Sequence, residues 1–377
     1  MSRNYKIVYD YRVFDGQIYG GISRYYVKLA IYLQRFVGCD VKVVAPFFRN
    51  NYLYELSRTK NGKNIIRGFK SSILEDRERC RRVLNRSLTD LYVDIKKPDV
   101  YHKTYYDGKW PGHCSAKKVV TIHDLIYEKN RHVYEGAEEL INKIRKDLNI
   151  SDLVICVSEN TKKDLLNYYK VDENKVVVIH HGVESYEEVI NFVYERKERK
   201  DSDLDYILYV GKRDGYKNFK TLVEAWSSSK NLKKNFSIYC FGGGNIAKEE
   251  REEWKKVGAD ADKIVHITGD DRALYRAYRN AYCFVYPSRY EGFGIPPLEA
   301  MACRCPVICA NNSSIPEIVG NAGIYFDATS SDALKECLEN CVNSEDSRRR
   351  LIEKGLERVK RFTWKKCAEK TYQEYKS

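Results

Sequence analysis

The stretch YPSRYEGFGIPPLEAMACRCPVI, residues 286–308, places two glutamates, two glycines and a pair of prolines between two apolar segments. The first segment ends at Ser288, and Pro296 and Pro297 are typical of the first turn of a helix, where a missing N–H costs no hydrogen bond. The intervening RYEGFG is therefore expected to form a loop at the carboxyl end of a strand. The stretch predicts one strand–loop–helix unit.

The same alternation of strand and helix runs along the whole chain. Short β-rich segments alternate with longer amphipathic segments, and no hairpin turn joins two strands, which predicts parallel sheets covered by helices on both faces. The expected strands are 6–14, 41–46, 100–106, 117–127, 152–158, 175–183, 205–211, 236–244, 263–269, 281–288, 305–311 and 322–328, and the expected helices are 22–36, 159–170, 218–229, 271–281, 296–303, 331–342 and 363–377.

A chain of 377 residues is too long for one ordinary hydrophobic core. The charged segment 184–204 has weak periodicity and is the predicted linker between an N-terminal Rossmann-like domain, 1–183, and a C-terminal one, 205–360. The last helix, within 361–377, has no strand after it and is expected to cross back to the first domain. Two doubly wound α/β domains facing across a cleft would hold ligands at the carboxyl ends of their strands.

The composition limits where the protein works and with which partners. No apolar run approaches the ~18 residues of a membrane-spanning helix. The first residues lack the apolar core of a signal peptide, so a cytoplasmic protein is expected. The 12 cysteines include no CxxC pair and predict reduced thiols rather than disulfides or a metal site.

Residues 49–118 hold 17 Lys or Arg against 8 Asp or Glu in a chain of net charge +13. This stretch suits a nucleic acid, an anionic membrane or a phosphorylated small molecule, and charge alone leaves the three open.

The loop and helix of the opening stretch combine features that a nucleotide-sugar requires. Gly292 and Gly294 allow positive φ and bring backbone amides close to a ligand, and a helix start attracts a diphosphate. Glu299, expected in the first helical turn, can accept hydrogen bonds from vicinal hydroxyls such as those of ribose. Glu291, in the loop, would face the hydroxyls of the group attached to the diphosphate. Each feature alone is also typical of an ordinary turn or helix cap, whereas their combination favours a ligand site.

Three segments resemble the signature of retaining GT-B glycosyltransferases, and more narrowly of family 4, which includes many bacterial mannosyltransferases and other hexosyltransferases that build surface polysaccharides. The segments are EGFGIPPLE (291–299) with its Glu-x7-Glu pattern, AMA-x-x-x-PVI (300–308) and SSIPEIVGNAGIYFD (313–327). The resemblance extends from GGISRYY (20–26) to FTWKKCAEKTYQEY (362–375). Two departures are Arg304, where the family usually has glycine, and HHGV (180–183), where asparagine commonly precedes the glycine.

The resemblance implies a set of site residues. Arg213 and Lys217 would stabilise the departing diphosphate in place of a metal ion. The amides of Gly20 and Gly21 would approach the same group from the first domain, and His123 would position the sugar. The other residues that would bind the nucleotide-sugar are Gly211, Gly243, Ser288, Gly292, Phe293, Gly294, Ile295 and Glu299. No metal ion and no cofactor are expected.

The resemblance implies an enzyme that moves a hexose onto a glycan or a polyprenyl-diphosphate-linked acceptor, with mannose from GDP-mannose as the first choice on family frequency. The catalytic residues would be Glu291, His123, Arg213 and Lys217. The resemblance implies retention at the anomeric carbon. No side chain is an obvious nucleophile, so the acceptor is expected to attack on the face from which the phosphate leaves, as is widely proposed for this family. The basic stretch 49–118 would bind the acceptor or the anionic inner face of the membrane.

Three alternatives remain open. A UDP-sugar can replace GDP-mannose, since the sequence does not identify the base. A nucleic-acid-binding protein would explain the positive charge, but no RNP, helix-turn-helix or finger pattern accompanies the basic residues, so no nucleic acid is expected as a partner. An inactive sugar-nucleotide binder is disfavoured because both glutamates and both cations are present.

Overall fold

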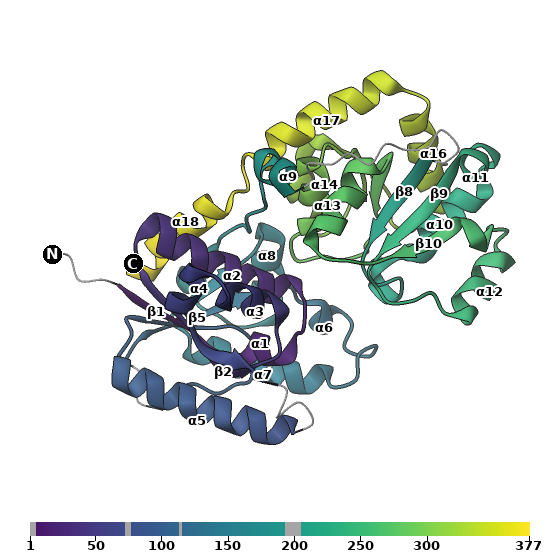
Figure 1. Ribbon diagram of the computed structural model, residues 1–377. Coiled ribbons are helices and arrows are strands. Elements are labelled where there is room, and N and C mark those ends of the chain that lie inside the picture. The colour runs from purple at the N-terminus through teal and green to yellow at the C-terminus, as the bar shows by residue number, and fades with distance from the viewer. Residues whose placement is uncertain (1–4, 72–76, 113–114, 193–204) are drawn as a thin grey trace. The chain divides into compact units, whose positions relative to one another are not determined.

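The computed structural model describes residues 5–71, 77–112, 115–192 and 205–377, and the chain divides into two compact units. The N-unit comprises residues 1–182 and 364–377, and the C-unit comprises residues 183–363. In the predicted linker, 184–204, a helix, α9 (Tyr186–Phe192), is present, and residues 193–204 lie outside the described residues. Each unit is built around one parallel sheet (Figure 1).

The sheet of the N-unit has seven strands: β1 (Lys6–Tyr9), β2 (Asp40–Phe48), β3 (Ile66–Lys70), β4 (Val100–Lys103), β5 (Lys117–Ile122), β6 (Leu153–Cys156) and β7 (Val176–Val178). They lie in the order β3-β2-β1-β4-β5-β6-β7, and every pairing is parallel. The chain moves outward from β1 to β3 and then returns to the other side of β1. The strand order therefore reverses between β1 and β4.

Helices cover both faces of this sheet. They are α1 (Arg12–Gly16), α2 (Gly21–Tyr32), the π-helical η1 (Leu33–Val37), α3 (Asn51–Ser57), α4 (Lys60–Ile65), α5 (Glu78–Lys96), α6 (Ile126–Lys129), α7 (Ala137–Ile150), α8 (Glu159–Tyr168), the 3₁₀ turn η2 (Glu173–Lys175) and α18 (Trp364–Lys376). The C-terminal α18 packs against α2 and η1. Figure 1 shows α2 and α18 on one side of the sheet and α5 on the opposite side.

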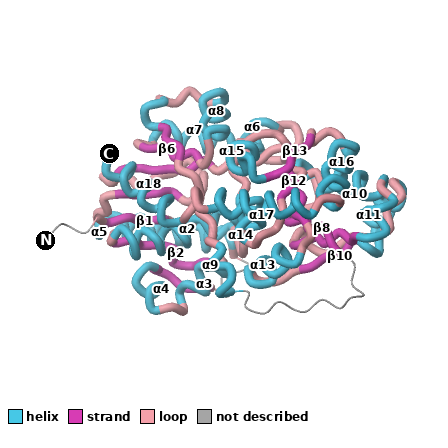
Figure 2. The backbone as a smooth tube through the Cα atoms, turned by 90° about the horizontal axis from the view of Figure 1, so that it is seen from above, coloured by secondary structure: helices cyan, strands magenta, loops and turns pink. Residues whose placement is uncertain are grey.

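The sheet of the C-unit has six strands: β8 (Asp205–Val210), β9 (Phe236–Phe241), β10 (Ile264–Ile267), β11 (Cys283–Tyr286), β12 (Val307–Ala310) and β13 (Gly323–Phe326). Their order, β10-β9-β8-β11-β12-β13, is again parallel and doubly wound. The helices are η3 (Gly215–Lys217), α10 (Phe219–Ser228), α11 (Lys230–Asn235), α12 (Lys248–Lys256), η4 (Ala261–Lys263), α13 (Asp271–Asn280), α14 (Ile295–Ala302), α15 (Ile315–Val319), η5 (Gly320–Ala322), α16 (Ser331–Val342) and α17 (Glu345–Val359). Figure 2 shows the strands of each unit side by side with helices around them.

The apolar sequence of the central strands explains why they form sheets of this kind. β6, β11 and β12 are buried along their whole length, as strands must be when helices cover both faces of a sheet. The predicted α/β class with two Rossmann-like sheets is therefore confirmed. No helix in the described part of the chain is both long and apolar enough to span a bilayer.

Several expected strands are longer than the observed ones, and several elements were not predicted. The strand expected over 6–14 ends at Tyr9, because the carboxylate of Asp10 accepts the Arg12 N–H at 3.1 Å and turns the chain into α1. The strand expected over 117–127 ends at Ile122 before α6. The missed elements include the edge strand β3 and the helices α1, α3, α4, α5, α6, α7, α9, α11, α12, α15 and α17. β3 has one buried residue, and α5 is rich in charged residues, so neither shows a strong apolar pattern.

Candidate active site

Two loops leave from the carboxyl ends of β8 and β11, the central strands at which the order of the C-unit sheet reverses. Loops at such a reversal diverge, and open α/β sheets bind their ligands between them. The first loop, 211–218, holds Gly211, Arg213 and Lys217, and the second, 287–294, holds Ser288 and Glu291. The fold therefore brings these predicted residues, 74 positions apart for Lys217 and Glu291, to one edge of the sheet.

An ion pair joins the two loops. The ammonium of Lys217 lies 2.7 Å from a carboxylate oxygen of Glu291, and both side chains are partly exposed. A third loop, which follows β12, holds Glu291 in place. The backbone N–H of Glu291 donates to Ser313 Oγ at 3.0 Å. The hydroxyl of Ser314 donates to the Glu291 carbonyl at 2.9 Å and to the Phe293 carbonyl at 2.7 Å. A cation and a carboxylate are thus held at the sheet edge while remaining accessible to a ligand.

Arg213 is used differently from Lys217. Its guanidinium donates to both carboxylate oxygens of Glu250, at 2.8 and 3.0 Å, and to the carbonyls of Gly244 and Asn245 at 3.0 and 3.1 Å. The hydrogen bonds to Glu250 raise the pKa of Arg213, and only 4% of the Arg213 side chain is exposed. Arg213 therefore ties the first loop to the glycine turn after β9. Its contact with a diphosphate remains a prediction.

The glycine turn after β9 comes very close to the first loop. A Cβ on Gly243, whose φ is +74°, would lie 2.6 Å from the Gly211 carbonyl oxygen. No other residue fits at that position without displacing one of the two loops. Close backbone packing thus explains Gly243, whereas Gly242 and Gly244 face open space and are explained by their φ of +79°.

The helix α14 begins as predicted at the end of the second loop. Gly294, with a φ of +115°, is its N-cap, and Pro296 and Pro297 stand in its first turn. Because both prolines lack an N–H, the first turn offers fewer donors to an anion than an ordinary helix start. The Ser288 hydroxyl is buried near this start and has no hydrogen-bond partner in the structure.

The expectation that Glu299 lies in the first turn of α14 is wrong. The helix starts at Ile295, so Glu299 falls in the second turn. Its side chain is 4% exposed, and Tyr278 donates a long hydrogen bond of 3.4 Å to its carboxylate. The helix ends near Arg304, whose φ of +61° is in the left-handed region. A glycine would adopt that conformation without strain, which explains the usual family residue there.

In the N-unit, the predicted residues Gly20 and Gly21 stand at the start of α2. Gly20 is its N-cap, and the amide oxygen of Gln17 accepts the Ser23 N–H at 3.3 Å, so a side chain of the protein occupies this helix start. A Cβ on Gly20 would collide with the Gln17 amide, whereas Gly21 faces open space. Gly21 is therefore the more accessible of the two.

His123 follows β5 and lies in an aromatic cluster. Its ring stacks on His181 with centroids 5.6 Å apart, and Tyr25 packs edge-on at 5.3 Å. Burial lowers the pKa of His123 to about 3, so the imidazole is neutral near pH 7, and its Nε2 has no hydrogen-bond partner in the structure. A cavity of about 40 Å³ beside it is lined by Tyr105, Tyr106, Asp124, Tyr127 and Glu128, among others. A neutral histidine there can form one hydrogen bond with a hydroxyl group, either as donor or as acceptor.

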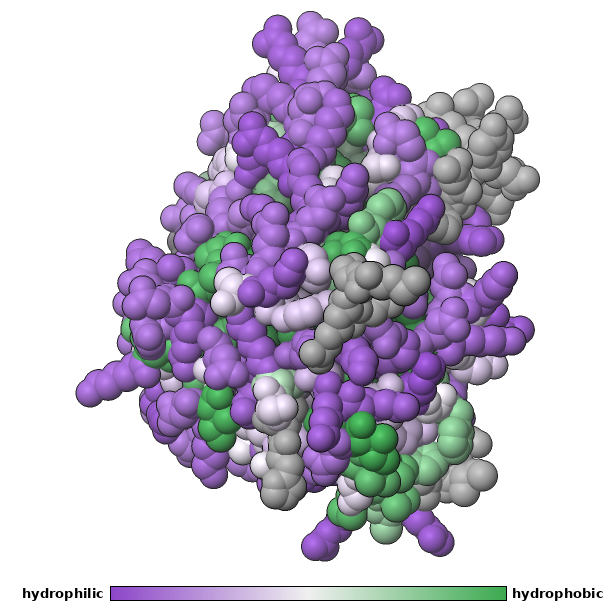
Figure 3. Space-filling model, turned by 90° about the vertical axis from the view of Figure 1, so that its left-hand side faces the viewer, coloured by the Kyte–Doolittle hydropathy of each residue, from purple (hydrophilic) through white to green (hydrophobic). Residues whose placement is uncertain are grey.

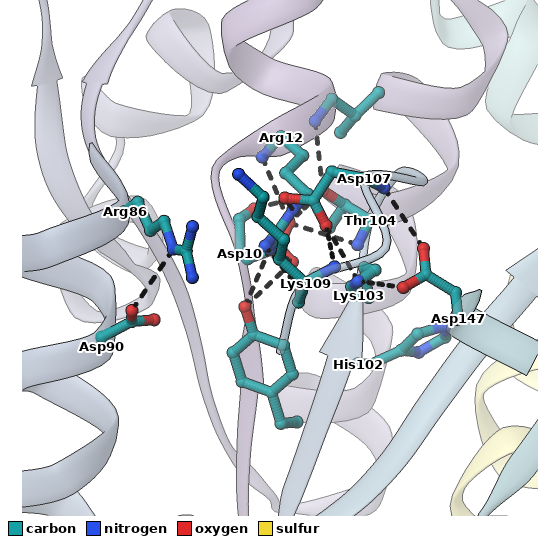
Figure 4. A network of polar contacts seen from close by, with 12 residues as sticks. Asp10, Arg12, Arg86, Asp90, His102, Lys103, Thr104, Asp107, Lys109 and Asp147 are labelled. Atoms are coloured by element: carbon teal, nitrogen blue, oxygen red, sulfur yellow. Dashed lines mark hydrogen bonds and ion pairs between the residues drawn. The ribbon is translucent and has the colours of Figure 1, made fainter. Parts of the chain in front are cut away.

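A buried ion network was not predicted from the sequence. It stands at the carboxyl ends of β1 and β4, where the N-unit sheet reverses (Figure 4). Arg12 pairs with Asp10 and with Asp107, the latter at 2.7 Å, while Lys103 pairs with Asp107 at 2.9 Å and with Asp147 of α7. The network fixes the loop that follows β4. Charged residues within a strand, as in VYHK, are the one sequence signal that pointed to it.

Other supporting residues were also missed. His181, Ser313 and Ser314 contact predicted residues, and Asn218 donates to the carbonyls of Pro287 and Ala328 at 3.0 and 2.9 Å. Single Ser, Asn and His residues carry no pattern that separates a supporting role from a surface one. Among the described residues, no group of three or more His, Cys, Asp or Glu side chains could hold a metal ion, and the cysteines are free thiols.

Comparison with known proteins adds independent findings. Residues 190–358 match the family described as "Glycosyl transferases group 1", and residues 19–185 match "Glycosyltransferase Family 4". An O-antigen chain mannosyltransferase B of Escherichia coli is 26% identical over 70% of this chain and 71% of its own length. The serotype-specific mannosyltransferase WbdA of the same species is 25% identical over 74% of this chain, which spans 37% of WbdA. The Anabaena protein Alr3699/HepE, solved with UDP and glucose, superposes with a TM-score of 0.73 at 14% identity, each chain being covered completely.

Proposed function

Because this chain belongs to the GT-B glycosyltransferases of the family 4 type, we propose that it transfers mannose from GDP-mannose, with retention, onto a glycan or polyprenyl-diphosphate-linked acceptor of a surface polysaccharide. The Lys217–Glu291 pair at the reversal of the C-unit sheet carries the assignment. This ion pair supplies a cation that can bind a diphosphate and a carboxylate that can bind sugar hydroxyls. The mannosyltransferase relatives support the choice of hexose.

In the proposed reaction, the oxygen of an acceptor hydroxyl bonds to the anomeric carbon as the bond from that carbon to the phosphate oxygen breaks. The leaving diphosphate takes the hydroxyl proton. Lys217 would turn from Glu291 to the diphosphate, where negative charge grows as the bond breaks. Glu291, released from the pair, would accept hydrogen bonds from the sugar hydroxyls. Glu299 would bind the ribose and His123 a hexose hydroxyl.

A UDP-sugar is the second candidate for the donor. The Anabaena protein of the same fold was solved with UDP and glucose, which favours keeping uridine nucleotides in the test. The residues proposed to bind the nucleotide-sugar would contact its phosphate, ribose and sugar, and none of them identifies the base.

The test is a thermal-shift screen of the full chain against GDP, UDP, ADP and dTDP, followed by turnover of the matching nucleotide-sugars. We expect stabilisation by GDP, turnover of GDP-mannose without added metal ions, and an α-linked product by NMR. Lys217→Met should lose the stabilisation, whereas Lys220→Met, an exposed lysine on α10, should keep it.

Three results would contradict the proposal. They are a strict requirement for magnesium or manganese, binding of random RNA in place of nucleotides, and nucleotide binding without turnover of any nucleotide-sugar. The last would indicate a binding protein rather than an enzyme.

A further inference from the structure

The helix α5 of the N-unit exposes an apolar stripe to solvent. Leu84, Leu88, Leu91 and Ile95 are between 41% and 65% exposed. Their spacing of four, three and four residues places them on one side of the helix, along about 16 Å of its length. The buried residues of the same helix, Arg81, Asn85, Thr89 and Val93, face the sheet instead. A soluble amphipathic helix would have polar residues at the stripe positions.

The exposed apolar surface continues beyond α5 to Phe69 of the edge strand β3. Phe69 of β3 is 58% exposed, and its ring packs edge-on against Phe47 at 5.1 Å. Asn85 of α5 bonds the backbone of Phe47 on both sides, with its carboxamide 2.8 Å from the N–H and from the carbonyl oxygen. Phe69 therefore adds one exposed apolar side chain at the edge of the sheet to which α5 is attached. Figure 3 shows hydrophobic residues gathered at the lower end of this face, at the level of α5 in Figure 1.

A basic cavity adjoins the C-terminal end of α5. It has a volume of about 280 Å³, and its lining includes Lys6, Lys42, Arg67 and Lys96 with Asp40 as the one carboxylate. Asp40 pairs with Lys42, so the lining keeps an excess of positive charge. The exposed charges of α5 itself nearly balance, since Arg79, Arg82, Arg86 and Lys96 stand against Glu78, Asp90 and Asp94. The positive charge is thus concentrated where Lys96 borders the cavity, next to Ile95 of the stripe.

We propose that α5 is an interfacial helix that inserts its apolar stripe into a membrane surface while the basic cavity binds the phosphates of anionic lipids. Apolar residues on one side of a helix beside a cationic rim are what such binding requires, because each contribution alone is weak. A second copy of this chain is the less favoured occupant, since two copies would bring equal positive charges together. The inference deepens the proposed function, because a polyprenyl-linked acceptor would lie in the same membrane.

The test is flotation of the full chain with vesicles of phosphatidylcholine, with and without phosphatidylglycerol. The stripe variant Leu88→Gln/Leu91→Gln/Ile95→Gln keeps helix propensity and changes exposed positions only. Its matched control is Val133→Gln/Ile150→Gln/Val257→Gln, which replaces exposed apolar residues elsewhere. We expect binding to anionic vesicles that the stripe variant weakens by about tenfold or more. The control should bind like the unmodified chain.

A charge variant separates the two contributions. Arg67→Gln/Lys96→Gln should weaken binding at low salt by about tenfold and have little further effect at high salt, whereas the stripe variant should weaken binding at both. Equal binding of the stripe variant and its control would overturn the proposal. The proposal would also be overturned if the unmodified chain formed a concentration-dependent dimer in sedimentation and the stripe variant was monomeric.

The outcome can be told apart from a failure of the proposed function. Turnover of the nucleotide-sugar with a water-soluble acceptor needs no membrane, so the stripe variant should retain it. If vesicles bind but no nucleotide-sugar reacts, the proposed function fails and α5 stands as a membrane-binding helix. If turnover is normal but no vesicle binds, the inference about α5 fails by itself.

Discussion

Lys217 and Glu291 form an ion pair of 2.7 Å between the loops that follow β8 and β11. Each residue is the other's counter-ion in the structure, and each has a partner in the proposed reaction. A donor that binds here must therefore exchange one set of charge contacts for another. Because both side chains are largely shielded from water, the pair should open only when the donor supplies replacement contacts for both charges.

The first prediction concerns the role of Glu291. Glu291→Gln should reduce kcat by roughly 100-fold, because a neutral amide cannot accept the charge-assisted hydrogen bonds of the sugar hydroxyls. Binding of the free nucleotide should change little and can be measured by calorimetry. Glu224→Gln, from the exposed pair Lys220–Glu224, is the matched control. Comparable losses in turnover and nucleotide binding would contradict the assigned role.

The second prediction concerns Arg213 as a link between loops. Arg213→Lys removes the planar set of donors to Glu250 and to the glycine turn and should destabilise the protein by about 2 kcal/mol, measured by urea unfolding. Arg349→Lys, on the exposed surface of α17, should be neutral. If Arg213→Lys keeps full stability but loses nucleotide affinity, Arg213 acts on the ligand and not on the loop.

The third prediction separates backbone strain from steric collision in the glycine turn. Gly244→Ala introduces a side chain at a φ of +79° where nothing lies within 4 Å and should cost about 1–2 kcal/mol. Gly243→Ala has a similar φ of +74° and in addition meets the Gly211 carbonyl, so it should cost more. Equal melting temperatures for the two variants would show that the loops can move apart freely.

The fourth prediction concerns pH. Burial lowers the pKa of His102 and of His123 from 6.5 to about 3. The unfolded chain therefore binds more protons between those values, and stability is complete above pH ~6.5 and falls as the pH decreases. From pH 7.5 to 5.5 each histidine should cost about 1.4 kcal/mol. His123→Asn should flatten the pH dependence of the unfolding free energy, measured by urea unfolding at each pH.

The fifth prediction concerns the attachment of α18 to the N-unit. The Tyr375 hydroxyl lies 2.6 Å from His102 Nδ1 and 3.1 Å from the Tyr9 hydroxyl, fully buried. Tyr375→Phe should lower the unfolding free energy by about 1–3 kcal/mol, because two buried polar groups lose their partner. Tyr372→Phe, on the same helix and partly exposed, should cost much less. Similar losses in both variants would show that packing rather than hydrogen bonding holds α18.

Much of the fold could be predicted from the sequence, because strands buried on both faces need continuous apolar residues and helices between them need an amphipathic period. The same logic located the loop that carries Glu291 and the start of α14 at the prolines. It overestimated the strand after Lys6, since a turn made by one side chain of Asp10 leaves no periodic signal.

The sequence by itself determined the α/β class and the position of the site residues along the chain, since both depend on local order. Only the tertiary structure decided which of them meet. It paired Lys217 with Glu291, committed Arg213 to Glu250, stacked His123 on His181 and left the stripe of α5 exposed. These relationships join residues far apart in the chain, and the fold alone sets the distances between them.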